Sequence, residues 1–170
     1  MFDSLTVYAD ELAAVLDDGE RLVASATVSY TAGREETGEP SGGVTWDIFG
    51  LDVPAWNAAA ERVVGGTTLV GSPGSLAGQL ARSMGAAGEL ILTDRRILVA
   101  RPISVGRPAD VEWGQPVSAV VDVRHDPRLL QRGRIRLTMR DGSMVRLMAG
   151  MLTRRQAARV VDGWSGLQSG

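Results

Sequence analysis

The sequence predicts a mainly β fold of the α+β class: a seven-stranded antiparallel barrel or sandwich capped by a C-terminal α-helix, with an N-terminal helix and a helical insertion. Two observations lead to this prediction. Apolar and polar residues alternate in short runs between turn residues over most of residues 89–148, which is typical of antiparallel strands. The segment 153–167 is amphipathic at helical spacing, so it is suited to closing one end of a small barrel.

Length and composition are those of a folded protein. The chain has 170 residues, of which 44% are hydrophobic and 22% charged, and we expect one domain over residues 1–170. It has no cysteine, which excludes disulfides and thiolate chemistry and is typical of a reducing compartment. The first residues have no basic start with an apolar run, and no stretch is long and apolar enough to cross a bilayer. We therefore expect a cytoplasmic protein, with peripheral membrane contact as a variant.

Charge is distributed unevenly along the chain. All 18 basic residues are arginine. Residues 1–90 carry a balance of −9 and residues 91–170 a balance of +7, so the net charge of −2 hides an acidic half and a basic half. Either the two halves fold against each other, or the charged surfaces meet partners.

The N-terminal part predicts a helix followed by a strand. Residues 1–18 form the helical unit, in which Leu5, Tyr8 and Leu12 begin an apolar face at spacings of three and four. Asp17-Asp18-Gly19 ends it. Residues 20–31 alternate and are rich in β-branched side chains, so they form the first strand.

Residues 33–87 form an insertion between the first and second core strands. The sequence predicts a turn-rich loop with a short strand at 44–49, and then a helical hairpin. Its first helix runs from Pro54 to about Val64, and its second follows Ser72-Pro73-Gly74-Ser75.

The remaining strands and the last helix follow in order. Strands are predicted at 89–93, 97–101, 109–113, 117–124, 133–139 and 143–148. Residues 153–167 form the capping helix, with Trp164 on its apolar face as a structural residue. A three-residue loop ending at Gly142, in the left-handed conformation, pairs Leu137 with Val145 and keeps apolar side chains on one face, whereas a two-residue turn would mix the faces.

Three pieces of this sequence resemble bacterial pleckstrin-homology and GRAM-like domains. They are Gly19-Glu20-Arg21-Leu22, the run G-E-L-I-L-T-D-R-R-I-L-V at 88–99, and Arg134-Ile135-Arg136-Leu137 with Asp141-Gly142-Ser143. Trp164 is similar in placement to a tryptophan of the family's last helix. The resemblance covers residues 19–32 and 88–167 and implies a binding role on a capped β-barrel. The insertion departs from the family's pattern, because lipid-binding members carry Lys and Arg there and this segment has only three arginines.

The residues offer little for catalysis, so we expect no enzyme, metal or cofactor. His125 is the one histidine and lies in a predicted turn, so metal sites of the nitrogen and sulfur type and a Ser-His-Asp triad lack partners. The glycine-rich stretch 65–75 is followed by no Lys, which a phosphate-cradling P-loop needs.

Five arginines are candidates for binding an anion or a partner. They are Arg124, Arg134, Arg136, Arg146 and Arg154. The three-residue loop sets Arg136 opposite Arg146, a like-charge pair that needs an anion. Asp122 on the adjacent strand supplies it internally, or the face meets an acidic partner, a phosphate or an anionic lipid headgroup. Nucleic acid is the weakest choice, because no stacking aromatic residues interleave the arginines.

The insertion offers a second candidate surface, made of apolar side chains. Its members are Trp56, Val63, Leu69, Leu76 and Leu80. They either cover one side of the barrel or form a subunit contact or a membrane contact. The sequence therefore predicts a non-catalytic binding or scaffolding module for a protein partner or a second copy, with a peripheral membrane adaptor as the alternative.

Overall fold

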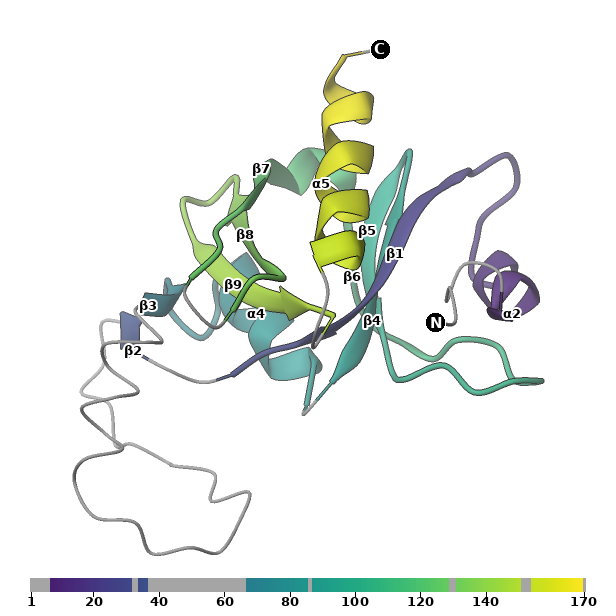
Figure 1. Ribbon diagram of the computed structural model, residues 1–170, viewed down its shortest axis with the longest axis horizontal. Coiled ribbons are helices and arrows are strands. Elements are labelled where there is room, and N and C mark those ends of the chain that lie inside the picture. Colours follow the sequence, from purple (N-terminus) through teal and green to yellow (C-terminus); the bar gives the residue numbers. More distant parts are fainter. Residues whose placement is uncertain are drawn as a thin grey trace, which may run out of the picture.

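The computed structural model describes residues 7–31, 34–36, 67–85, 87–128, 131–150 and 154–169, and it is mainly β (Figure 1). The helices are α2 (Ala9–Ala13), α4 (Leu76–Ser83) and α5 (Arg154–Gln168), with a 3-10 turn η1 (Val117–Ala119). The strands are β1 (Leu22–Ser29), β2 (Arg34–Glu36), β3 (Thr67–Val70), β4 (Gly88–Thr93), β5 (Arg96–Ala100), β6 (Val111–Pro116), β7 (Val120–His125), β8 (Arg134–Met139) and β9 (Met144–Ala149).

All strands belong to one hydrogen-bonded sheet, whose order is β2-β3-β9-β1-β4-β5-β6, with β8 on the other edge of β9 and β7 beyond β8. Eight strands pair antiparallel, and β2 pairs parallel with β3. β1 pairs with β4 along most of its length and with β9 at its end, so it joins the two parts of the sheet. In Figure 1, α5 lies between the strands β7–β9 and the strands β1, β4 and β5.

The seven predicted strands and the capping helix are present, but the sheet is open. β6 and β7 follow each other in the chain and do not pair within the described residues, because η1 turns the backbone between them. The same turn explains why the strand predicted from residue 117 begins at Val120. The predicted N-terminal helix ends earlier than expected, since its hydrogen bonding changes to the tighter i to i−3 pattern after Ala13; its predicted start lies outside the described residues.

The insertion contributes to the sheet, which the sequence analysis did not foresee. β3, predicted as part of the helical hairpin, pairs with β9, and its residue Leu69 is 5% exposed in the core. The second predicted helix is confirmed as α4, where the Ser75 side chain accepts a hydrogen bond from the Gly78 amide at 3.2 Å. The predicted short strand at 44–49 and helix at 54–64 lie outside the described residues.

The main core lies between the sheet and the helices α4 and α5. Trp164 is 4% exposed and packs there with Ala157 and Val160 of α5, as predicted. Gly163 brings α5 close to β1, because a Cβ at this position would come within 2.9 Å of Val23. A second, smaller core on the outer face of β4 and β5 is covered by α2 through Leu12, so both faces of β4 are buried.

The β8–β9 hairpin has the predicted register and loop. Leu137 pairs with Val145, and Gly142 has a φ of +80°, the left-handed conformation that a bulged three-residue loop requires. The loop also supports α4: the Asp141 carboxylate accepts the Leu76 amide at 2.8 Å, and the Ser143 hydroxyl accepts the Ala77 amide at 3.1 Å. The first turn of α4 is therefore capped by a loop 65 residues away in sequence.

We expect Trp164→Ala to lower the free energy of unfolding by about 3–5 kcal/mol, because it leaves a large cavity under α5. Urea denaturation followed by far-UV circular dichroism measures this loss. The control is Ser165→Ala, whose exposed neighbouring site should change stability by no more than about 0.5 kcal/mol. Equal losses in the two variants would contradict the docking of α5 through Trp164.

Candidate functional site

Three arginines form a row across the strands β7, β8 and β9. Arg124 pairs with Arg136, and Arg136 pairs with Arg146. Side chains directly opposite on neighbouring strands point to the same face, so the three guanidinium groups share one face of the sheet. The core residues Ile135 and Leu147 alternate with them and point to the other face, toward α4 and α5. We call these three residues the arginine row.

Two aspartates supply counter-charge to the row. Asp122 bonds Arg124 through Nε, and its Oδ2 lies 3.8 Å from Nη2 of Arg136. This confirms the prediction that Asp122 pairs internally. Asp126, which the sequence analysis did not single out, bonds Nε of Arg146. Its carboxylate also lies 3.4 Å from Arg134, so four arginines share two carboxylates and the cluster keeps a net charge of +2.

Exposure falls steeply across the cluster. The side chain of Arg124 is 58% exposed, that of Arg136 27%, that of Arg146 15% and that of Arg134 only 3%. Arg134 was predicted as an exposed member, which is wrong. Its Nη1 donates to Gln131 Oε1 at 2.9 Å, and its Nη2 lies 3.4 Å from the Asp126 carboxylate.

Arg136 is the least satisfied member of the row. Its Nε is buried and has no hydrogen-bond partner among the described residues. Its contact with Asp122 is the longest ion pair of the cluster, and that carboxylate already bonds Arg124. The buried Nε is out of reach of an external group, but the Arg136 side chain is 27% exposed between two like charges, so its guanidinium group is suited to an external anion.

The other predicted site residues lie apart from this row. Arg154 begins α5, which packs against the opposite face of the sheet, so the structure does not group it with the arginine row. His125 is the exposed last residue of β7.

The predicted apolar surface of the insertion is corrected. Leu69 and Leu80 are 5% and 0% exposed, so they belong to the core and are not available to a partner. Leu76 is half-buried and packs against the same core. The burial of these three residues agrees with the alternative in which the insertion covers the sheet. Trp56 and Val63 lie outside the described residues.

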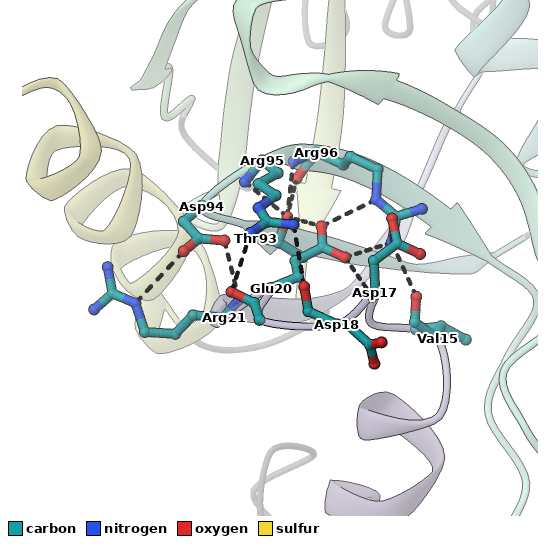
Figure 2. A network of polar contacts seen from close by, with 10 residues as sticks. Val15, Asp17, Asp18, Glu20, Arg21, Thr93, Asp94, Arg95 and Arg96 are labelled. Atoms are coloured by element: carbon teal, nitrogen blue, oxygen red, sulfur yellow. Dashed lines mark hydrogen bonds and ion pairs between the residues drawn. The ribbon is translucent and has the colours of Figure 1, made fainter.

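A second polar cluster joins the two sequence segments at 19–22 and 88–99. Figure 2 shows Glu20 between Thr93 and Arg96, and its side chain is fully buried. Thr93 Oγ1 donates to Glu20 Oε1 at 2.5 Å and Arg96 Nε donates to the same oxygen at 3.0 Å, while the Asp17 amide donates to Oε2 at 2.8 Å. The Thr93 hydroxyl also accepts the Arg96 amide at 2.7 Å, which shapes the turn before β5.

This cluster is a structural clamp. Arg96 also donates to the Val15 carbonyl at 3.1 Å, so one guanidinium holds the end of the N-terminal helical segment against the β4–β5 turn. The hydrogen bonds from Arg96, together with those from Thr93 and Asp17, outweigh burial and lower the pKa of Glu20 from 4.5 to about 2. The buried carboxylate is charged, and both of its oxygens accept hydrogen bonds. No three His, Cys, Asp or Glu side chains in the described ranges gather to hold a metal ion.

Comparisons with known proteins add similar structures but no family. No family model and no curated protein matches the chain. A Vav1 chain bound by an allosteric inhibitor is similar with a TM-score of 0.40 and 16% identity over 49% of this chain. The C-terminal domain of an unknown protein from Leishmania infantum is similar with a TM-score of 0.44 and 10% identity over 96% of this chain. This chain spans 15% of the Vav1 chain and 99% of the Leishmania domain.

No helix in the described part of the chain has the length and hydropathy needed to span a bilayer.

We expect Glu20→Gln to lower the free energy of unfolding by about 3 kcal/mol at pH 7, because the half-buried Arg96 loses its buried carboxylate and keeps only the exposed carboxylate of Asp17, at 3.2 Å. The matched control is Asp18→Asn, which removes one negative charge from the same loop at an exposed side chain. Urea denaturation at neutral pH measures both. If the two variants lose equally little, the clamp is not a stabilising contact.

The clamp also predicts an acid dependence of stability. A carboxyl group whose pKa falls from 4.5 to about 2 on folding stabilises the native state above pH 4.5, and this contribution is lost as the pH falls toward 2. The difference in unfolding free energy between the wild type and Glu20→Gln should therefore shrink between pH 4.5 and pH 2. Urea titrations at several pH values test it, and a difference that stays constant over this range would contradict the lowered pKa.

Proposed function

We propose that this chain is a non-catalytic, cytoplasmic binding module of the pleckstrin-homology superfold, and that it binds an acidic segment of a protein partner over the arginine row. The fold assignment is supported by the strand β1 shared between two parts of an antiparallel sheet and by the docked C-terminal helix. It is further supported by the motif segments at 19–22 and 88–99, which bond each other through Glu20, Thr93 and Arg96.

The single observation that carries the binding proposal is the position of Arg136. It lies between Arg124 and Arg146, on a face that the described helices leave open, with a side chain that is 27% exposed and only a 3.8 Å contact to the shared carboxylate of Asp122. An acidic side chain placed over the row would accept hydrogen bonds from Arg136 and relieve its repulsion by the two neighbouring arginines. The exposed guanidinium of Arg124 lies at the rim, where it is suited to guiding the approach of an anion.

A protein partner is favoured over a membrane by the charge and the chemistry of this face. Membrane-binding basic clusters present Lys and Arg residues to the anionic surface, whereas Asp122 and Asp126 balance two of the four charges of the arginine row and Arg134, which leaves a net +2. Half-buried Met144 and Met148 flank the arginines on the outward side of β9. A mixed surface of this kind fits a peptide with acidic and apolar side chains. A second copy of this chain is one such partner, because residues 1–90 carry a balance of −9.

The test is the binding of a fluorescent deca-glutamate peptide, measured by anisotropy at two salt concentrations. We expect salt-sensitive binding that Arg136→Gln weakens about tenfold, since a hydrogen-bonded charge contact is lost. Arg155→Gln is the matched control, because it removes the same charge from an exposed position on α5. Sedimentation of the wild-type chain at rising concentration tests whether a second copy is the partner.

Three results would contradict the proposal. The peptide fails to bind, or the Arg136 and Arg155 variants lose equally and only net charge matters. Alternatively, vesicles that contain phosphatidylserine bind the chain and the peptide does not, which supports a peripheral membrane adaptor instead.

A further inference from the structure

A small cleft opens where the edge of β9 passes from one partner strand to another. Met144 and Val145 pair with β3, whereas Met148 and Ala149 pair with β1. Between them, Arg146 and Leu147 of β9 pair with neither β3 nor β1, which leaves a gap in the hydrogen-bonded strand pairing on this edge. The gap holds a half-open cavity of about 20 Å³, lined by Ser29, Thr31, Thr68, Gln131, Arg134, Arg146, Leu147 and Met148. We call this cavity the ladder-gap cleft.

The lining of the ladder-gap cleft is rich in hydrogen-bond donors and has no carboxylate. Its two guanidinium groups are 3% and 15% exposed, and they are held from behind by Asp126. Arg146 uses Nε for Asp126 and Nη1 for the Thr67 carbonyl, which takes two of its five N–H donors. Three hydroxyl groups, the Gln131 side chain and the two apolar residues Leu147 and Met148 complete the lining.

The local charge favours an anion. Arg134 and Arg146 line the cleft and share the carboxylate of Asp126, and the positive charge of Arg128 also acts on Arg134. Burial and the two neighbouring arginines outweigh Asp126 and lower the pKa of Arg134. A phosphate monoester carries about −1.5 to −2 at neutral pH and offers three acceptor oxygens.

The size of the cleft sets how much of a ligand enters. A volume of about 20 Å³ corresponds to a single water-sized group. The cleft therefore admits one oxygen atom of a terminal group, while the rest of the ligand stays outside. This excludes a buried sugar or nucleobase and fits a phosphoryl oxygen entering between the guanidinium groups and the hydroxyls.

We propose that the ladder-gap cleft binds the phosphoryl group of a phosphate monoester, and that a phosphorylated side chain of a protein partner carries this group. The inference rests on the proposed function, because Arg146 belongs both to the cleft and to the arginine row. The acidic segment of the partner then contacts this chain at two sites: its carboxylates bind over Arg136, and one phosphoryl group binds in the ladder-gap cleft.

The first test is calorimetric titration of the full chain with inorganic phosphate at constant ionic strength. We expect binding that Thr68→Val or Ser29→Ala weakens about tenfold, because each removes a hydroxyl that lines the cleft. Thr138→Val is the matched control, since Thr138 is half-buried on β8 and does not line the cleft. Binding should strengthen from pH 5.5 to pH 7.5 as phosphate becomes dianionic. Absence of phosphate binding, or equal losses in the cleft and control variants, would overturn the proposal.

The second test separates the sources of the phosphoryl group and separates this inference from the proposed function. A phosphoserine peptide with flanking glutamates should bind more tightly than its unphosphorylated form, and Thr68→Val should remove only this gain. If vesicles that contain phosphatidic acid bind the chain and phosphorylation does not strengthen peptide binding, a protein is not the source of the phosphoryl group.

The two proposals can be contradicted separately. If deca-glutamate fails to bind while phosphate still binds, the proposed function is wrong and the phosphoryl site in the cleft is retained. If deca-glutamate binds and phosphate does not, only the proposed phosphoryl site is wrong.

Discussion

The register of the β8–β9 hairpin is the constraint on which the rest of the structure depends. Side chains alternate between the two faces of a strand, so a shift of one residue would exchange them. The observed register places Leu137 and Val145 in the core and Arg136 and Arg146 on the outer face. The same hairpin holds α4 through the Asp141 carboxylate, so its loop links the sheet to the helix of the insertion. One local geometry therefore determines the core, the docking of α4 and the position of the charged face.

The alignment of three arginines on adjacent strands costs stability, because like charges directly opposite each other repel. Asp122 and Asp126 offset part of this cost from the ends of the row. Arg124 and Arg146 bond these carboxylates, whereas Arg136 keeps a buried Nε without a partner among the described residues. The clamp around Glu20 differs in that its charged group has all its partners within the protein: the single carboxylate accepts hydrogen bonds from Thr93, Arg96 and Asp17.

Local pattern was sufficient to predict the features that short loops determine. The length of the loop at Gly142 predicts the pairing of Arg136 with Arg146, because the turn type and the alternation of apolar residues admit one register. The role of Trp164 follows from helical spacing in the same way. Pairing across longer connections is not determined by local pattern. Arg124 lies opposite Arg136 across a longer connection and a register shift in β7, and the burial of Arg134 depends on a turn with no periodic signal.

Contacts between residues distant in the chain also leave no signal in the local sequence pattern. Glu20 and Arg96 are 76 residues apart, and nothing in either segment alone indicates that they bond. The four residues of β3 read as part of a glycine-rich helical hairpin, because a short edge strand has too few residues for alternation to be informative. Leu69 and Leu80 were therefore candidates for an exposed surface, although they complete the core.

The most direct test of the central claim is an NMR titration that follows the arginine Nε–Hε signals as deca-glutamate is added. The account predicts that the signals of Arg136 and Arg146 shift together in a saturable, salt-sensitive way, while those of Arg107 and Arg155 remain in place. Uniform shifts of all arginine signals, or shifts confined to arginines outside β7, β8 and β9, would contradict a built anion site on this face of the sheet.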